Sequence, residues 1–103
     1  MKYQLTTEAD GVRIGLQETL GFKDHQDFRR LVSEVLERKP NRVKVDLSAL
    51  SMVDSAGLGL LVILNERVKK AGGSVTLSRP NEDVKRLLAI VEFDKLFAID
   101  TAA

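Results

Sequence analysis

The chain of 103 residues has the length of one ordinary domain, and its 16 Lys and Arg residues nearly balance its 15 Asp and Glu residues, for a net charge of +1. This balance argues against direct nucleic-acid binding, which usually needs a marked excess of positive charge on one face. The absence of cysteine excludes disulfides and thiol chemistry, and the longest apolar run, 60–64, is too short to span a membrane, so we expect a cytoplasmic protein without membrane insertion.

The first part of the chain alternates apolar and polar residues, which predicts two short strands around 3–5 and 12–16 joined by a tight turn. We expect Gly11 to supply the positive φ angle of this turn. Five apolar residues then follow helical spacing and predict an amphipathic helix that begins at Asp24 as N-cap and ends at Lys39-Pro40 (Phe28, Leu31, Val32, Val35 and Leu36).

Segment 42–48, rich in β-branched residues, predicts a central strand, and 55–71 predicts a helix closed by two glycines. A further strand is expected at 74–78 and a further helix at 80–91. The tail after residue 92 is expected to form a short helical turn that packs on the core through Phe93, Leu96 and Phe97. The order β-β-α-β-α-β-α indicates a single α/β domain over 1–103, with a mixed sheet of four to five strands and helices mainly on one face.

The segment SMVDSAGLG is the most informative part of the chain, because Ser55 lies where the strand pattern gives way to a long helix. A serine nucleophile needs a base, and the only histidine, His25, is expected to be a first-turn residue of the first helix. The nucleophile-elbow pattern G-x-S-x-G is only half present, since Val53 replaces its first glycine. We therefore expect that the protein is not an enzyme.

Cofactor and metal sites find no support either. Gly57 and Gly59 lack the third small residue of a dinucleotide fingerprint, because Val62 takes its place, and no P-loop pattern occurs. Asp46 and Asp54 are separated by a whole loop, with no cluster of acids or histidine beside them. We expect no cofactor and no metal.

From the residues alone, two interpretations of Ser55 stay open. In the first, the Ser55 oxygen is the N-cap of the helix at 55–71. In the second, the oxygen accepts a phosphate: the N-terminus of a helix tolerates a phosphate, and its charge beside Asp54 would repel an incoming partner. Small residues at 56 and 57 are expected to leave room for a kinase to approach.

A helical wheel of 55–71 predicts two contrasting faces. One is the expected core face (Gly57, Leu60, Leu61, Leu64, Val68 and Ala71). The other aligns two apolar side chains with the serine hydroxyl (Ser55, Leu58, Gly59, Val62 and Glu66). This stripe indicates a docking surface, unless another element of the fold covers it.

Nearly the whole chain resembles the STAS domain of bacterial anti-sigma factor antagonists. The resemblance rests on a strand that ends in Asp46-Leu47-Ser48, the motif DSAGLG at 54–59, the two glycines at 72 and 73 before a strand, and the tail NEDVKRLL…FDKLF. The motif at 54–59 is the specific part, and the rest is supporting pattern. The resemblance implies the STAS fold.

The resemblance also implies that Ser55 is phosphorylated by a partner, an anti-sigma factor that is a serine kinase with a histidine-kinase-like ATP-binding fold. The unphosphorylated STAS protein binds this kinase and releases the regulator it sequesters, and a PP2C-type phosphatase resets the switch. The contact surface carried over to this chain comprises Asp54, Ser55, Ala56, Gly57, Leu58, Gly59, Val62 and Glu66. The alternative is a STAS subunit of a membrane-associated transport or stress-sensing assembly that has no phosphorylation cycle.

Overall fold

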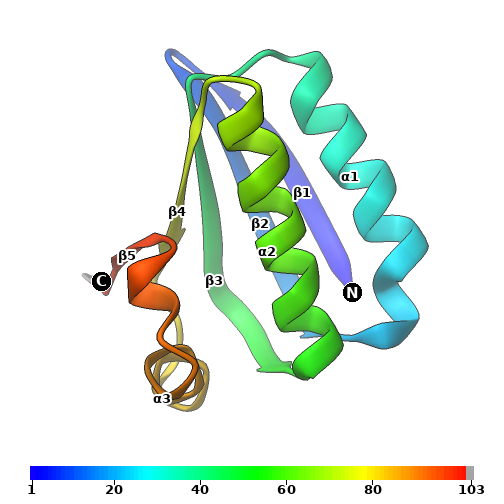
Figure 1. Ribbon diagram of the computed structural model, residues 1–103. Helices are drawn as coiled ribbons and strands as arrows, with labels where there is room; N and C mark the ends of the chain where they lie inside the picture. Colours follow the sequence, from blue (N-terminus) through cyan, green and yellow to red (C-terminus); the bar gives the residue numbers. More distant parts are fainter. Residues whose placement is uncertain (102–103) are drawn as a thin grey trace.

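A five-stranded mixed sheet forms the centre of the protein in the computed structural model, which describes residues 1–101 (Figure 1). The strands lie in the same order in the sheet as in the sequence. The first two form an antiparallel hairpin, and every later neighbour pairs in parallel. The strands are β1 (Lys2–Glu8), β2 (Gly11–Leu20), β3 (Arg42–Val53), β4 (Ser74–Ser78) and β5 (Ala98–Asp100).

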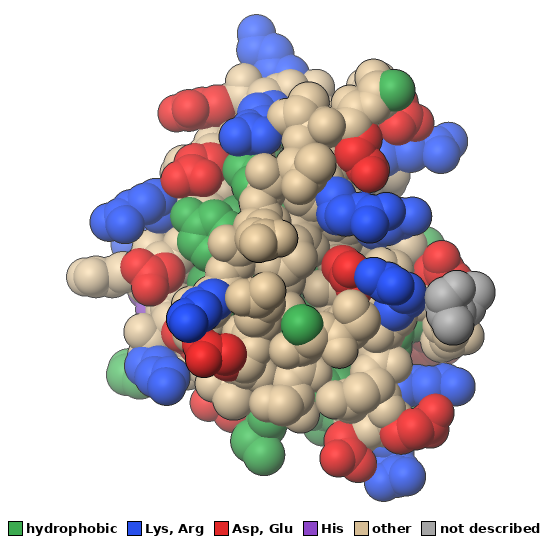
Figure 2. Space-filling model, turned by 180° about the vertical axis from the view of Figure 1, so that it is seen from behind, with side chains coloured by type: hydrophobic (Ala, Val, Ile, Leu, Met, Phe, Trp, Pro, Cys, Tyr) green, Lys and Arg blue, Asp and Glu red, His purple; other side chains and the backbone are tan. Residues whose placement is uncertain are grey.

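Two helices cover one face of this sheet, α1 (His25–Glu37) and α2 (Ser55–Lys70), and lie side by side in front of it (Figure 1). A third, α3 (Glu82–Ile90), packs against the far end of β3, where the Asn81 side chain donates a hydrogen bond to the Leu50 carbonyl. Two single 3-10 turns precede α1 and β5, η1 (Phe22–Asp24) and η2 (Phe93–Lys95). No helix of the described part of the chain covers the back of the sheet, and Figure 2 shows this face as a mainly polar surface with charged side chains around its rim.

The core lies between the sheet and the helices. Side chains on β2 and β3 alternate between this core and the open face, so the inward residues are almost fully buried (Val12, Ile14 and Leu16; Val43, Val45 and Leu47). The helix α1 contributes the apolar stripe predicted from its spacing, with four buried side chains and Leu36 half-buried (Phe28, Leu31, Val32 and Val35). The predicted order of elements and the α/β class are confirmed.

Several predicted boundaries and roles were wrong. The strand β3 continues to Val53 instead of ending near 48, because it pairs with β2 beyond the point where β4 ends. The three-residue β5 was not predicted, since so short a strand shows no period. In the tail, Phe93 and Phe97 are buried as expected, whereas Leu96 is 44% exposed.

Gly11 does not have the positive φ angle that was expected for its turn. Among the glycines of residues 1–101, the one with a positive φ angle is Gly72, at the end of α2. Gly11 is required for a different reason. A Cβ there would lie 2.0 Å from the carbonyl oxygen of Arg42, because β3 begins directly beside it. A contact between strands, rather than the conformation of a turn, therefore selects this glycine.

Candidate functional site

The start of α2 is held by Asp54, not by Ser55. Asp54 has extended backbone angles, and its carboxylate accepts a hydrogen bond of 2.8 Å from the N–H of Gly57. The interpretation of Ser55 as the N-cap was therefore wrong, because the cap lies one residue earlier and Ser55 is the first residue inside the helix. Its side chain is exposed, and no other group in residues 1–101 hydrogen-bonds to its hydroxyl.

The neighbouring serines differ from Ser55 in this respect. The hydroxyl of Ser51 donates a hydrogen bond of 2.8 Å to the carbonyl oxygen of Glu18 on β2. Ser48 donates its backbone N–H to the carboxylate of Asp46. Burial opposes ionisation of Asp46, but this bond and the guanidinium of Arg79 together lower its pKa. Both serines therefore belong to local hydrogen-bonding structure, and Ser55 presents its hydroxyl to solvent.

Asp54 also links α2 to the turn that precedes α1. Its backbone N–H donates to the carbonyl of Leu20, and its second carboxylate oxygen lies 3.4 Å from the N–H of Phe22. A Cβ at Gly21 would lie 2.5 Å from this oxygen, so the two segments are in close contact. The geometry around Ser55 is consequently fixed by residues more than thirty positions earlier.

A second carboxylate fixes the same turn from the other side. Asp24 stands at the N-cap position of α1 as predicted, yet its side chain makes no capping bond to α1. It accepts hydrogen bonds from the N–H of Gly21 and from the amino group of Met1, both shorter than 3 Å (2.8 and 2.7 Å). Although burial alone raises it, the pKa of Asp24 is lowered by these two donors.

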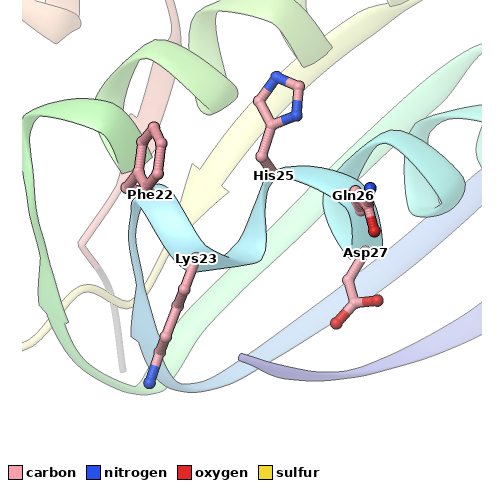
Figure 3. Close-up of a pocket in the computed structure, with 5 residues that line it drawn as sticks. All are labelled: Phe22, Lys23, His25, Gln26 and Asp27. Atoms are coloured by element: carbon pink, nitrogen blue, oxygen red, sulfur yellow. The ribbon is translucent and has the colours of Figure 1, made fainter.

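Two large apolar side chains flank this end of the molecule. Phe22 is 80% exposed and Met52 is 64% exposed, and together with Asp54 they line a shallow hollow of about 380 Å³. Figure 3 shows a second hollow on the neighbouring η1–α1 segment, where Phe22 and His25 point to one side and Lys23 and Asp27 to the other. Neither Phe22 nor Met52 was predicted as part of the site. The sequence did contain a signal for them, because each is a large apolar residue at a junction between elements, where polar residues are usual.

The predicted contact surface on α2 divides into three groups. Asp54, Ser55, Gly59 and Glu66 are exposed. Ala56, Leu58 and Val62 are half-buried, and the last two pack against the core, so the apolar stripe expected to face solvent is partly covered. Gly57 is buried, as the helical wheel predicts, whereas Ala71 on the same predicted face is exposed just beyond the end of the helix.

Gly57 and Gly59 have opposite surroundings, although they stand two residues apart. A Cβ at Gly57 would lie 2.3 Å from the carbonyl oxygen of Leu20 and 2.9 Å from a methyl group of Val53. A Cβ at Gly59 would have no atom within 4 Å. Gly57 therefore allows α2 to approach the sheet and does not serve to leave space for a kinase, whereas Gly59 leaves open space on the outer surface.

The electrostatics at Ser55 suit an anion. The first N–H groups of a helix have no partner within the helix, and they form the positive end of its dipole. The first turn of α2 contains no acidic residue, so Asp54 is the carboxylate next to the hydroxyl. Within residues 1–101, no three His, Asp or Glu side chains are grouped as a metal site would need, and no helix is long and apolar enough to cross a membrane.

Comparison with known proteins identifies the family of this chain and agrees with its fold. The model of the STAS domain family matches residues 3–102. The chain belongs to this family. It is 34% identical over 93 residues to a STAS-domain containing protein of Pseudomonas aeruginosa, covering 88% of this chain and 91% of that one.

Solved structures of STAS proteins share the fold. A candidate anti-sigma factor antagonist of Thermotoga maritima superposes with a TM-score of 0.88 at 25% identity, over 97% of this chain and 86% of that chain. The anti-sigma factor antagonist SpoIIAA in its unphosphorylated form gives a TM-score of 0.75 at 19% identity, over 99% and 90%. The phosphorylated form of SpoIIAA from Bacillus gives 0.72 at the same 19% identity, over 97% and 92%.

Proposed function

We propose that this STAS domain is an anti-sigma factor antagonist whose partner binding is switched off by phosphorylation of Ser55. The observation that carries the proposal is the Ser55 hydroxyl, which is exposed and unbonded on the first turn of α2, while Asp54 supplies the cap. A phosphate there leaves the fold intact, because Ser55 contributes no capping bond that would be lost. The structural relatives named as antagonists support the same function.

The partner in this proposal is an anti-sigma factor that is also a serine kinase with a histidine-kinase-like ATP-binding fold, acting in the cytoplasm. The kinase transfers the γ-phosphoryl group of ATP to the Ser55 oxygen, ADP leaves, and the hydroxyl proton passes to a base of the kinase. A PP2C-type phosphatase hydrolyses the phosphoserine and restores the free form.

The physical effect of the phosphate is local. It adds a charge of about −1.5 to −2 next to Asp54, which lines a hollow together with exposed Phe22 and Met52. An apolar contact surface loses affinity when a hydrated dianion must be buried with it. The proposed contact surface comprises these two side chains together with the exposed and half-buried residues around Ser55 (Asp54, Ser55, Ala56, Leu58, Gly59, Val62 and Glu66), and Gly57 lies buried beneath it.

The proposal is tested by binding measurements with substituted proteins. The partner is first captured from extracts of the source cells on immobilised Ser55→Ala protein, identified by mass spectrometry, and purified. Ser55→Ala is expected to bind it permanently, and Ser55→Asp or Ser55→Glu at least about tenfold more weakly. Ser33→Ala is the matched control, because Ser33 is likewise an exposed helix residue whose hydroxyl makes no hydrogen bond within residues 1–101.

Phosphosite mapping on the protein from its own cells, with and without stress, completes the test. Phosphate on Ser55 whose occupancy changes with conditions supports the switch. Equal binding by Ser55→Ala and Ser55→Asp, with Ser55 unmodified under all conditions, would falsify it and favour a structural subunit of a membrane-associated assembly.

A further inference from the structure

The outer edge of β1 is free along the whole seven-residue strand. One side of β1 pairs with β2 over all seven residues, and no strand of residues 1–101 lies on its other side. Outside this ladder, no backbone group of Lys2–Glu8 hydrogen-bonds to any other part of residues 1–101. The opposite edge of the sheet, β5, is only three residues long.

Proteins usually protect such an edge, and β1 has few of the usual protections. Its sequence KYQLTTE contains no proline, and its register with β2 has no bulge. Its charges stand at the two ends, Lys2 at the start and Glu8 at the end. Both are exposed and lie on the open face of the sheet, since Tyr3 and Thr7 contact α1 on the other face.

This arrangement of charges is self-complementary. When two copies of a strand pair antiparallel about a two-fold axis, directly opposed residues must lie on the same face, so the sum of their numbers is even. The register that overlaps all seven residues has a sum of ten, and it places Leu5 opposite itself. The same register places Lys2 of each copy opposite Glu8 of the other.

The helix beside β1 shows the same symmetry. The side of α1 next to the edge, together with the C-cap residue Arg38, carries charges spaced three, four and four residues apart (Asp27, Arg30, Glu34 and Arg38). Tyr3 shows that this row lies over β1, because its hydroxyl donates a hydrogen bond to Glu34. Burial and the charge of Glu34 raise the pKa of Tyr3, and Arg30 and Asp27 are close enough to lower and to raise this pKa, respectively. Arg38 bonds to Thr7, 2.6 Å away.

The helix α1 runs parallel to β1, because it returns antiparallel to β2. A two-fold axis through Leu5 therefore also places the start of this row of charges in one copy opposite the end of the row in the other copy. Asp27 of one copy approaches Arg38 of the other, and the two central residues of the row, Arg30 and Glu34, also meet as opposite charges. None of these four side chains forms an ion pair within residues 1–101.

We propose that the edge strand β1 is a homodimerisation surface, on which a second copy of this chain pairs antiparallel to form a continuous ten-stranded sheet. The strand ladder supplies the association, and the charges at the ends of the strand and along α1 select the register and exclude other partners. Ser55 follows β3, two strands away from this edge, and stays accessible in both copies. The inference is independent of the phosphorylation switch, because no residue of β1 belongs to the Ser55 site.

Sedimentation velocity over about 10 μM to about 1 mM tests the self-association directly, and we expect a concentration-dependent dimer. Lys2→Glu and Glu8→Lys each oppose like charges at both ends of the ladder, so each is expected to weaken the dimer by about tenfold or more. An equimolar mixture of the two variants restores opposite charges at both ends, and is expected to dimerise again as a mixed pair. Lys44→Glu, the same charge reversal on the open face of β3, is the matched control and leaves the dimer unchanged.

Circular dichroism of each variant shows whether the fold is retained. A second measurement needs no substitution: amide hydrogen exchange in β1 is expected to slow as the concentration of the unsubstituted protein rises. A protein that stays monomeric up to about 1 mM overturns the proposal. So does a dimer whose affinity is indifferent to the charge reversals, or variants that fail to associate when mixed.

Discussion

Alanine substitutions at Gly57 and Gly59 are expected to change stability in opposite directions. Each replaces the same residue on the same helix, and removing glycine from a helix gains up to about 1 kcal/mol. At Gly59 a Cβ meets no atom within 4 Å, so this gain is realised. At Gly57 the Cβ would lie 2.3 Å from the carbonyl oxygen of Leu20, which cannot retreat freely because it also accepts a hydrogen bond of 3.1 Å from the N–H of Asp54.

Overpacking of this kind costs about 1–3 kcal/mol, so Gly57→Ala is expected to be the less stable variant by about 1–3 kcal/mol relative to Gly59→Ala. Urea denaturation followed by circular dichroism measures the difference. For a slope of about 1–1.5 kcal/mol per molar urea, the two midpoints differ by about 0.7–3 M. Midpoints that shift in the same direction by the same amount would refute the inference that Gly57 is selected by its approach to β2.

Three further substitutions test the surroundings of Ser55. Asp24→Asn is expected to lower the free energy of unfolding at pH 7 by about 1–3 kcal/mol and to make it depend less on pH. The folded-state pKa of Asp24 is lowered, so its carboxylate stabilises the fold above about pH 4, and this contribution is lost as the pH falls through the folded pKa. Urea titrations from pH 7 to pH 3 that show the same pH dependence for the variant and the unsubstituted protein contradict this. Phe22→Ala is expected to change stability by less than about 0.5 kcal/mol yet to weaken binding of the purified partner by about fivefold or more. The control Ile90→Ala, at a similarly exposed residue of α3, is expected to change neither stability nor binding. Calorimetric titration measures the two affinities, and equal affinities would mean that Phe22 is not part of the contact surface. Asp54→Ala is expected to lose about 1 kcal/mol of stability and Asp54→Asn less than half of this, since an amide oxygen still caps the N–H of Gly57, and equal losses in thermal unfolding refute the capping role.

The elements that sequence predicts well are those whose signal is local and periodic. The apolar spacing of α1 and the β-branched run of β3 both describe one face of one element, and the structure buries these faces as expected. The class and the order of elements follow from such patterns, because packing of apolar faces decides them. Ser55 was predicted at the start of a helix for the same reason.

The features that were not predicted depend on contacts between distant segments. Asp54 and Ser55 are both good N-cap residues, and the choice between them is made by β3, which pairs with β2 as far as Val53 and so sets the last extended residue. Gly11 was assigned to a turn, although its real constraint is the adjacent strand. The exposure of Phe22 likewise follows from where η1 meets α2, and no local pattern contains this information.

The link between Asp54 and the end of β2 affects how the proposed kinase of Ser55 should be sought. A peptide that spans residues 50–60 contains the whole DSAGLG motif, but it lacks the carbonyl of Leu20 and the N–H of Phe22, which hold Asp54 in place. In such a peptide the cap and the first turn of α2 have no support, because an isolated helix of this length is unstable in water. Peptide libraries therefore contain the sequence of the site without its folded conformation. A search for the kinase should begin with the folded domain as substrate.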